Sequence, residues 1–112
     1  MSTVDVRLVA ALMALAQTGQ CTTYGALAEA LQIAGPGRIR RLTAMLETLM
    51  EEDAAEGRPL RAALVLGRAS DGLPARGFFV KAHELGLCPE DMPHFSAREF
   101  HLAQLELLFA AL

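Results

Sequence analysis

The sequence predicts a mainly α-helical domain that carries a small β-hairpin. Two stretches with apolar residues at helical spacing are joined by Gly35-Pro36-Gly37, which is typical of a tight turn between two helices. A third apolar-periodic stretch precedes them, and a short apolar segment with turn residues follows them. Three helices followed by a hairpin is the order of a winged helix-turn-helix, in which the hairpin forms the wing.

The length and composition of the chain predict a single domain over residues 1–112. This length is enough to bury a core, and 53% hydrophobic with 21% charged residues is typical of a globular protein. The formal net charge of -3 argues against a tight, non-specific coat on nucleic acid, but it allows a local basic patch. With only Cys21 and Cys88, and no run of apolar residues long enough to span a membrane, we expect a cytoplasmic protein.

The first helix is expected to start at a cap on Ser2 or Thr3 and to run to about Gln17, with Gly19 closing it. Hydrophobic residues recur in it at steps of three and four, which predicts one buried face. The residues of this face are Val4, Leu8, Leu12 and Leu15.

Thr22 and Thr23 are the predicted caps of the second helix, because a threonine hydroxyl accepts hydrogen bonds from the free amides of a first turn. The third helix is predicted to begin near Arg38. The charge run 51–56, followed by Gly57 and Pro59, is expected to end it and form a loop. The predicted buried stripe of the third helix is Ile39, Leu42, Leu46 and Leu49.

The wing is predicted from the apolar segment 60–66, the turn residues Asp71-Gly72 and Pro74, and a second strand at residues 77–80. A short helix over residues 78–85, ended by a glycine, is expected to follow.

The final helix is predicted to begin at Ser96, which has the spacing of a capping box with Glu99, and Phe95 with Phe100 would form a hydrophobic staple. This helix has more apolar residues than one buried stripe requires. Its apolar surface either covers the first helix or forms a homodimer contact. The dimer candidates are Phe100, Leu105, Leu108 and Leu112.

The candidate nucleic-acid contacts begin with Arg38, Arg40 and Arg41, which open the third helix, while acidic residues gather at its other end. Both placements oppose the helix dipole, at a cost of about 0.3 to 1 kcal/mol for each charge. Helix stability alone does not favour this order, whereas guanidinium groups suit phosphates and guanine edges. The alternative is a solvated face, or pairing of these arginines with the acidic stretch 51–56.

Arg68 and Arg76 bracket the predicted wing, so they are further candidates for DNA contact. They are also ordinary residues for the edge of a hairpin. Thr23 and Tyr24 lie at the entry to the second helix; an aromatic side chain there is often a packing residue with its hydroxyl at the surface.

The segments TTYG (22–25), LA (27–28), GP (35–36) and Arg38 resemble the helix-turn-helix of alkylguanine-DNA alkyltransferases and alkyltransferase-like proteins. The resemblance implies that Tyr24 and Arg38 act on DNA, with Arg38 entering the base stack in place of an extruded nucleotide. The PCHR motif of that family has no counterpart at Pro59-Leu60-Arg61, so we expect no dealkylation. Residues 59–86 resemble small uncharacterised bacterial proteins, which supply no activity.

Catalysis and metal binding have no clear centre in the sequence. The spacing of His83, Cys88, His94 and His101, with Glu90 or Asp91, matches no compact zinc motif, and no third group orients a nucleophilic Cys88. We therefore expect a bacterial DNA-binding protein without cofactor or enzymatic activity. The alternative function is a protein-interaction or dimerisation module that does not bind nucleic acid.

Overall fold

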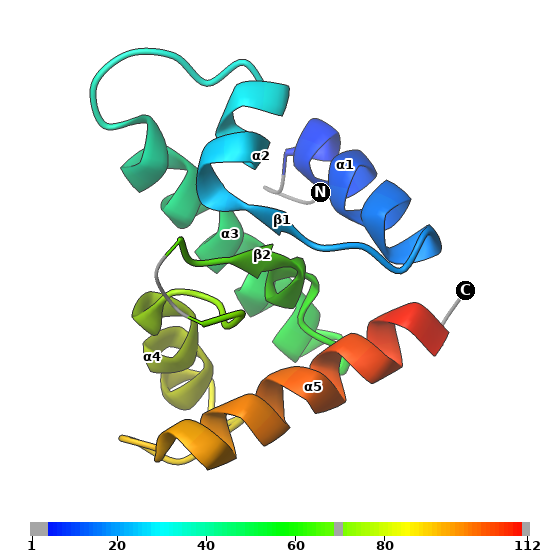
Figure 1. The fold of residues 1–112 in the computed structure, drawn as a ribbon, viewed down its shortest axis with the longest axis vertical. Helices are drawn as coiled ribbons and strands as arrows, with labels where there is room; N and C mark the ends of the chain where they lie inside the picture. Colours follow the sequence, from blue (N-terminus) through cyan, green and yellow to red (C-terminus); the bar gives the residue numbers. More distant parts are fainter. Residues whose placement is uncertain (1–4, 69–70, 111–112) are drawn as a thin grey trace.

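The computed structural model describes residues 5–68 and 71–110 (Figure 1). The described part is mainly α-helical with one small two-stranded sheet, as predicted, but the strands are parallel and the winged helix-turn-helix is not confirmed. None of its helices has both the length and the apolar character needed to cross a membrane. The elements in chain order are α1 (Val6–Gln17), β1 (Thr22–Thr23), α2 (Tyr24–Ala30), α3 (Arg38–Ala55), the 3-10 helix η1 (Arg61–Leu64), β2 (Val65–Leu66), α4 (Arg76–Glu84) and α5 (His94–Ala110).

The short helix η1 lies at the centre of the fold, where it packs against α1, α3 and α5. Ala62, Ala63 and Leu64 are all buried. The two alanines have side chains small enough to let larger helices approach them closely, while leucines from those helices fill the remaining space. Fully buried leucines around η1 include Leu8, Leu12, Leu42, Leu49 and Leu60.

The predicted hairpin wing is wrong. Residues 61–64 form η1 instead of a strand, and β2 pairs in parallel with β1, with Thr22 opposite Val65. Residues 77–80, predicted as the second strand, lie within α4, because Phe78 and Ala82 share one face at helical spacing and both are buried. Gly72 does have a positive φ of 81°, but its turn does not join two paired strands.

The starts of α2 and α3 are as predicted. The Thr23 hydroxyl accepts from the amide of Ala26 at 3.2 Å, and α3 begins at Arg38. The first helix is capped by Asp5, while the predicted caps at residues 2 and 3 lie outside the described residues.

The predicted end of α3 is wrong, because the helix continues through the charge run to Ala55. Residues 49, 50 and 53 within this extension are buried, so the last turns of α3 belong to the core. Ile39 was also placed wrongly, since 40% of it is exposed, whereas the other three members of the predicted stripe are buried.

The predicted start of α5 is wrong as well. The helix begins at His94, and the amide of Ala97 donates to the carbonyl of Pro93 at 2.9 Å, so Ser96 lies inside the first turn. No hydrophobic staple forms, because Phe95 is 72% exposed.

The face proposed for a homodimer is largely used inside the monomer. Leu108 is buried, and Phe100 and Leu105 pack partly buried against the core. Leu112 lies outside the described residues. The alternative interpretation was that this helix covers the first helix. The structure shows α5 packed against α1 and also against η1, while Leu102 and Leu107 remain exposed.

Candidate nucleic-acid interface

The start of α3 is presented by a loop of residues 31–37 whose conformation depends on glycine. Gly35 and Gly37 have φ values of 87° and 74°, in the left-handed region that favours glycine. Gly37 occupies the N-cap position and has no side chain, so no side-chain oxygen caps the first turn of α3. The positive end of this helix is therefore left with arginines and free amide groups at the surface.

Arg41 holds this loop in place. Its Nη1 atom donates to the carbonyl of Pro36 at 3.0 Å, and its Nη2 atom donates to the carbonyl of Ala34. Its guanidinium therefore binds the loop that precedes α3, and contact of Arg41 with DNA stays a prediction. We expect Arg41 to fix the conformation of this loop.

Arg41→Ala is expected to loosen the loop without unfolding the domain. Loss of two hydrogen bonds should cost about 1 to 3 kcal/mol, since each contributes about 0.5 to 1.5 kcal/mol. Hydrogen exchange should show faster exchange of the amides of residues 33–38, and Arg40→Ala provides a control with the same loss of charge. Equal exchange in both variants would contradict the positioning role.

Arg38 and Arg40 are exposed, and neither has an ion pair with any described residue. The alternative in which the stretch 51–56 neutralises them is therefore not seen. Its acidic side chains instead pair with bases that lie later in the chain. These pairs are Glu51–Lys81 (2.6 Å), Glu52–Arg58 (3.2 Å), Asp53–Arg58 (3.1 Å), Asp53–Arg61 (2.7 Å) and Glu56–Arg58 (3.7 Å).

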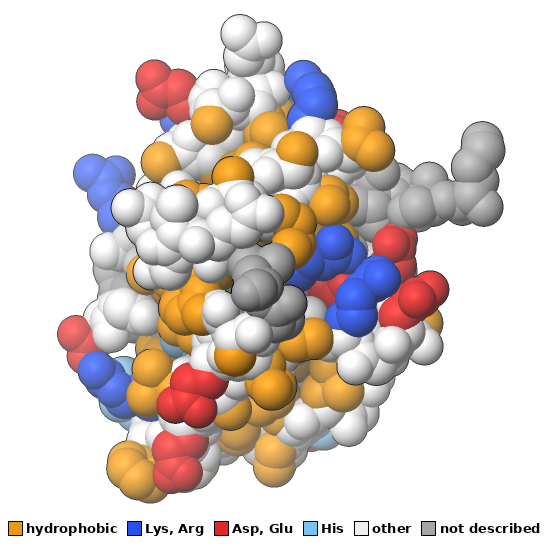
Figure 2. Space-filling view, turned by 90° about the vertical axis from the view of Figure 1, so that its right-hand side faces the viewer, with side chains coloured by type: hydrophobic (Ala, Val, Ile, Leu, Met, Phe, Trp, Pro, Cys, Tyr) orange, Lys and Arg blue, Asp and Glu red, His pale blue; other side chains and the backbone are white. Residues whose placement is uncertain are grey.

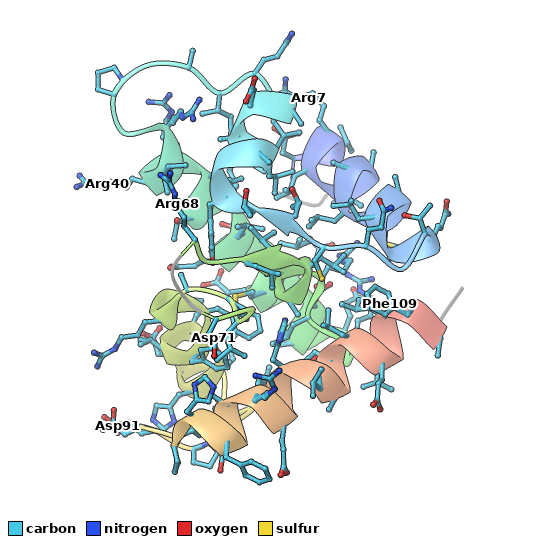
Figure 3. All side chains as sticks on the ribbon, in the orientation of Figure 1. Arg7, Arg40, Arg68, Asp71, Asp91 and Phe109 are labelled. Atoms are coloured by element: carbon cyan, nitrogen blue, oxygen red, sulfur yellow. The ribbon has the colours of Figure 1, made fainter. Side chains whose placement is uncertain are left out.

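The structure brings Arg40 and Arg68 to the same side of the molecule (Figure 3). Arg68 follows β2 and is exposed, and Arg76 is the exposed first residue of α4. Neither forms an ion pair within the described ranges. By contrast, on the face drawn in Figure 2 the basic side chains are scattered and several lie directly beside acidic ones.

Thr23 and Tyr24 have structural contacts where they were predicted to touch DNA. The Thr23 hydroxyl caps α2, and Tyr24 is partly buried against the core. Burial raises the pKa of the Tyr24 phenol, an effect that the backbone of Ala75 opposes.

A second feature is a cleft of about 910 Å³ between α4, residues 85–93 and the first turns of α5. Arg76 and His83 line it from α4, and His94 lines it from α5. Sequence reasoning missed this cleft, because its existence depends on how the start of α5 sits against α4. The one feature of the sequence that points to this cleft is the concentration of acidic residues and histidines over residues 83–94.

The groups considered for metal or nucleophilic chemistry do not form one site, because Cys88 and His101 do not line the cleft that His83, Glu90, Asp91 and His94 share. Cys88 donates its thiol to the carbonyl of Phe79 at 3.8 Å, and burial raises the pKa of that thiol. His83 Nδ1 lies 2.9 Å from the carbonyl of Cys88, while His101 is buried against the carbonyl of Ala63. Over residues 5–68 and 71–110, no three His, Cys, Asp or Glu side chains lie together in a way that would hold a metal ion.

Comparison with models of protein families, with curated proteins and with solved structures found no match to this chain. We therefore take the contacts of the chain itself as the basis for a functional proposal.

Proposed function

We propose that this protein binds DNA without catalysis, through the start of α3 and Arg68. The observation that carries the proposal is the distribution of ion pairs. The acidic residues at the end of α3 are paired with Lys81, Arg58 and Arg61, whereas Arg38 and Arg40 have no acidic partner among the described residues. The chain is acidic as a whole, yet this end of α3 keeps its positive charge.

The geometry of α2 and α3 also supports DNA binding. The two helices pack together across a short loop, as in a helix-turn-helix, and an α-helix fits the major groove. Guanidinium groups on the first turn add to the positive end of the helix dipole, so both attract phosphate. The amide of Gly67, the residue before Arg68, donates to the carbonyl of Leu73 at 2.8 Å. The resemblance to alkyltransferase-like proteins supports Arg38 as the central residue.

Fluorescence anisotropy with duplex, mismatched and single-stranded DNA over a range of salt concentrations tests the proposal. We expect affinity to fall as salt rises, because each phosphate contact releases counterions and contributes about -0.9 to the logarithmic slope on duplex DNA. Replacing both Arg38 and Arg40 by alanine should make that slope shallower by about 1.8 if each contacts one phosphate. Arg38→Lys keeps the charge but not the planar fork, so a large loss would indicate a specific role.

The matched control is Arg98→Glu on the exposed side of α5, which lowers the net charge by the same two units as the double alanine variant. This variant should keep both the affinity and the slope of the wild type. Absence of salt-sensitive binding to all three kinds of DNA at low ionic strength would overturn the proposal, as would equal losses in the two variants.

A further inference from the structure

The cleft between α4 and α5 has an apolar floor. Leu73, Pro74 and Ala97 line it and are buried, while Phe79 and Val80 extend the apolar surface toward solvent. The Phe79 ring also packs against Phe100, with centroids 6.4 Å apart, which ties the α4 wall of the cleft to α5. The floor is therefore made of side chains that are buried in the folded protein.

The rim of the cleft is acidic. Four carboxylates line it, from Asp71, Glu84, Glu90 and Asp91, against the single cation of Arg76. Figure 3 draws Asp71 and Asp91 apart from one another, with Asp71 near α4 and Asp91 in the segment before α5.

These rim carboxylates have only weak partners within the described residues. Asp71 and Glu90 lie 3.9 Å and 3.7 Å from His94 and His83, which are charged only when protonated. Glu84 lies 3.9 Å from Lys81, whose ammonium is held more closely by another acid, at 2.6 Å. The rim therefore keeps an excess of negative charge that the protein itself does not neutralise.

We propose that this cleft docks a linear segment of a partner protein in which an apolar side chain is flanked by Lys or Arg. The volume lies within the range of about 300 to 1,000 Å³ that is typical of ligand sites, and the floor accepts an apolar side chain. Because the carboxylates come from three separate segments around the floor, one cation cannot meet them all. A peptide with basic residues on both sides of an apolar side chain can place that side chain on the apolar floor and its cations beside the carboxylates of the rim.

The two parts of the cleft have different roles in this interaction. Removal of the apolar anchor from water supplies most of the affinity. The exposed carboxylates steer the basic segment to the cleft and discriminate against acidic segments, since exposed charge pairs contribute more to specificity and association rate than to affinity.

Selection of a random linear peptide library on the wild-type protein tests the proposal, with Glu84→Lys/Glu90→Lys as the counter-selected variant. We expect enriched peptides to contain an apolar residue between basic residues, and to bind the reversed variant at least about tenfold more weakly. Glu99→Lys/Glu106→Lys, on the exposed face of α5, carries the same charge change outside the cleft and should bind them as the wild type does. Thermal melts of the variants check that each is folded.

Three results would overturn the proposal: enriched peptides that are acidic, enriched peptides that share no motif, and enriched peptides that bind the two reversed variants with equal affinity. Sedimentation of the wild type tests another occupant. If the wild type self-associates and Glu84→Lys/Glu90→Lys does not, the occupant of the cleft is the exposed segment Arg38-Ile39-Arg40 of a second copy. This result would overturn the proposal of a peptide from a partner protein. The DNA-binding experiment changes residues on α3 and the peptide experiment changes residues of the cleft. Either proposal can therefore be overturned while the other stands.

Discussion

Replacing Asp53 by alanine is expected to lower the free energy of unfolding by about 3 to 5 kcal/mol, the usual effect of breaking a buried ion pair by removing one partner. The side chain of Asp53 is completely buried at the end of α3. One carboxylate oxygen accepts from Arg58 Nε at 3.1 Å and from Arg61 Nη2 at 2.7 Å, and the other accepts from the Arg61 amide at 3.0 Å. These bonds fasten the chain reversal at residues 56–60 to the end of α3. Without the carboxylate, the largely buried Arg61 guanidinium loses its partner.

Urea denaturation followed by circular dichroism measures this effect. Glu56→Ala is the matched control, because Glu56 belongs to the same charge cluster but is exposed and lies 3.7 Å from Arg58. Exposed pairs contribute about 0 to 1 kcal/mol, so this variant should stay close to the wild type. Similar small effects in both variants would show that Asp53 is not the fastening point.

The parts of the fold that the sequence predicted correctly depend on local chemistry. The threonine cap of α2 and the glycine-proline-glycine turn before α3 each require particular residues at particular positions, so the helix starts at Tyr24 and Arg38 were recognisable. The prediction of a hairpin was wrong because an apolar run as short as 60–66 shows no periodicity that would distinguish a strand from a buried helical turn. Its chain is buried by α1, α3 and α5 together, which is information that the local sequence does not contain.

The sequence also does not predict the roles of charged residues whose partners lie elsewhere in the fold. The charge run after α3 was expected to be a loop, but Asp53 is neutralised by arginines five and eight positions later and can be buried. Arg41 was grouped with Arg38 and Arg40 by sequence, although the preceding loop binds its guanidinium. Charge type and spacing therefore do not separate Arg41, which binds the preceding loop, from Arg38 and Arg40, which have no ion pair with a described residue.

Removing α5 by truncation after Pro93 is expected to abolish cooperative unfolding. The helix closes the core over η1: Gln104 Oε1 accepts from the amide of Leu60 at 2.8 Å, and His101 Nε2 lies 2.8 Å from the carbonyl of Ala63. Both backbone groups belong to buried residues, and their loss of partners would add to the exposure of the leucines beneath α5. Burial lowers the pKa of His101, so the neutral imidazole that donates to this carbonyl is the favoured form.

Two point variants make the truncation result interpretable. Gln104→Ala leaves the buried Leu60 amide without its acceptor and should cost about 1 to 3 kcal/mol, while Leu107→Ala, on the exposed side of the same helix, should change stability by no more than about 0.5 kcal/mol. Thermal melts by circular dichroism compare the three proteins with the wild type. A truncated chain that still melts in one sharp transition would show that α1 to α4 fold without α5. Because α5 also forms one wall of the acidic cleft, a stable truncated chain would then separate the cleft from the α3 surface experimentally.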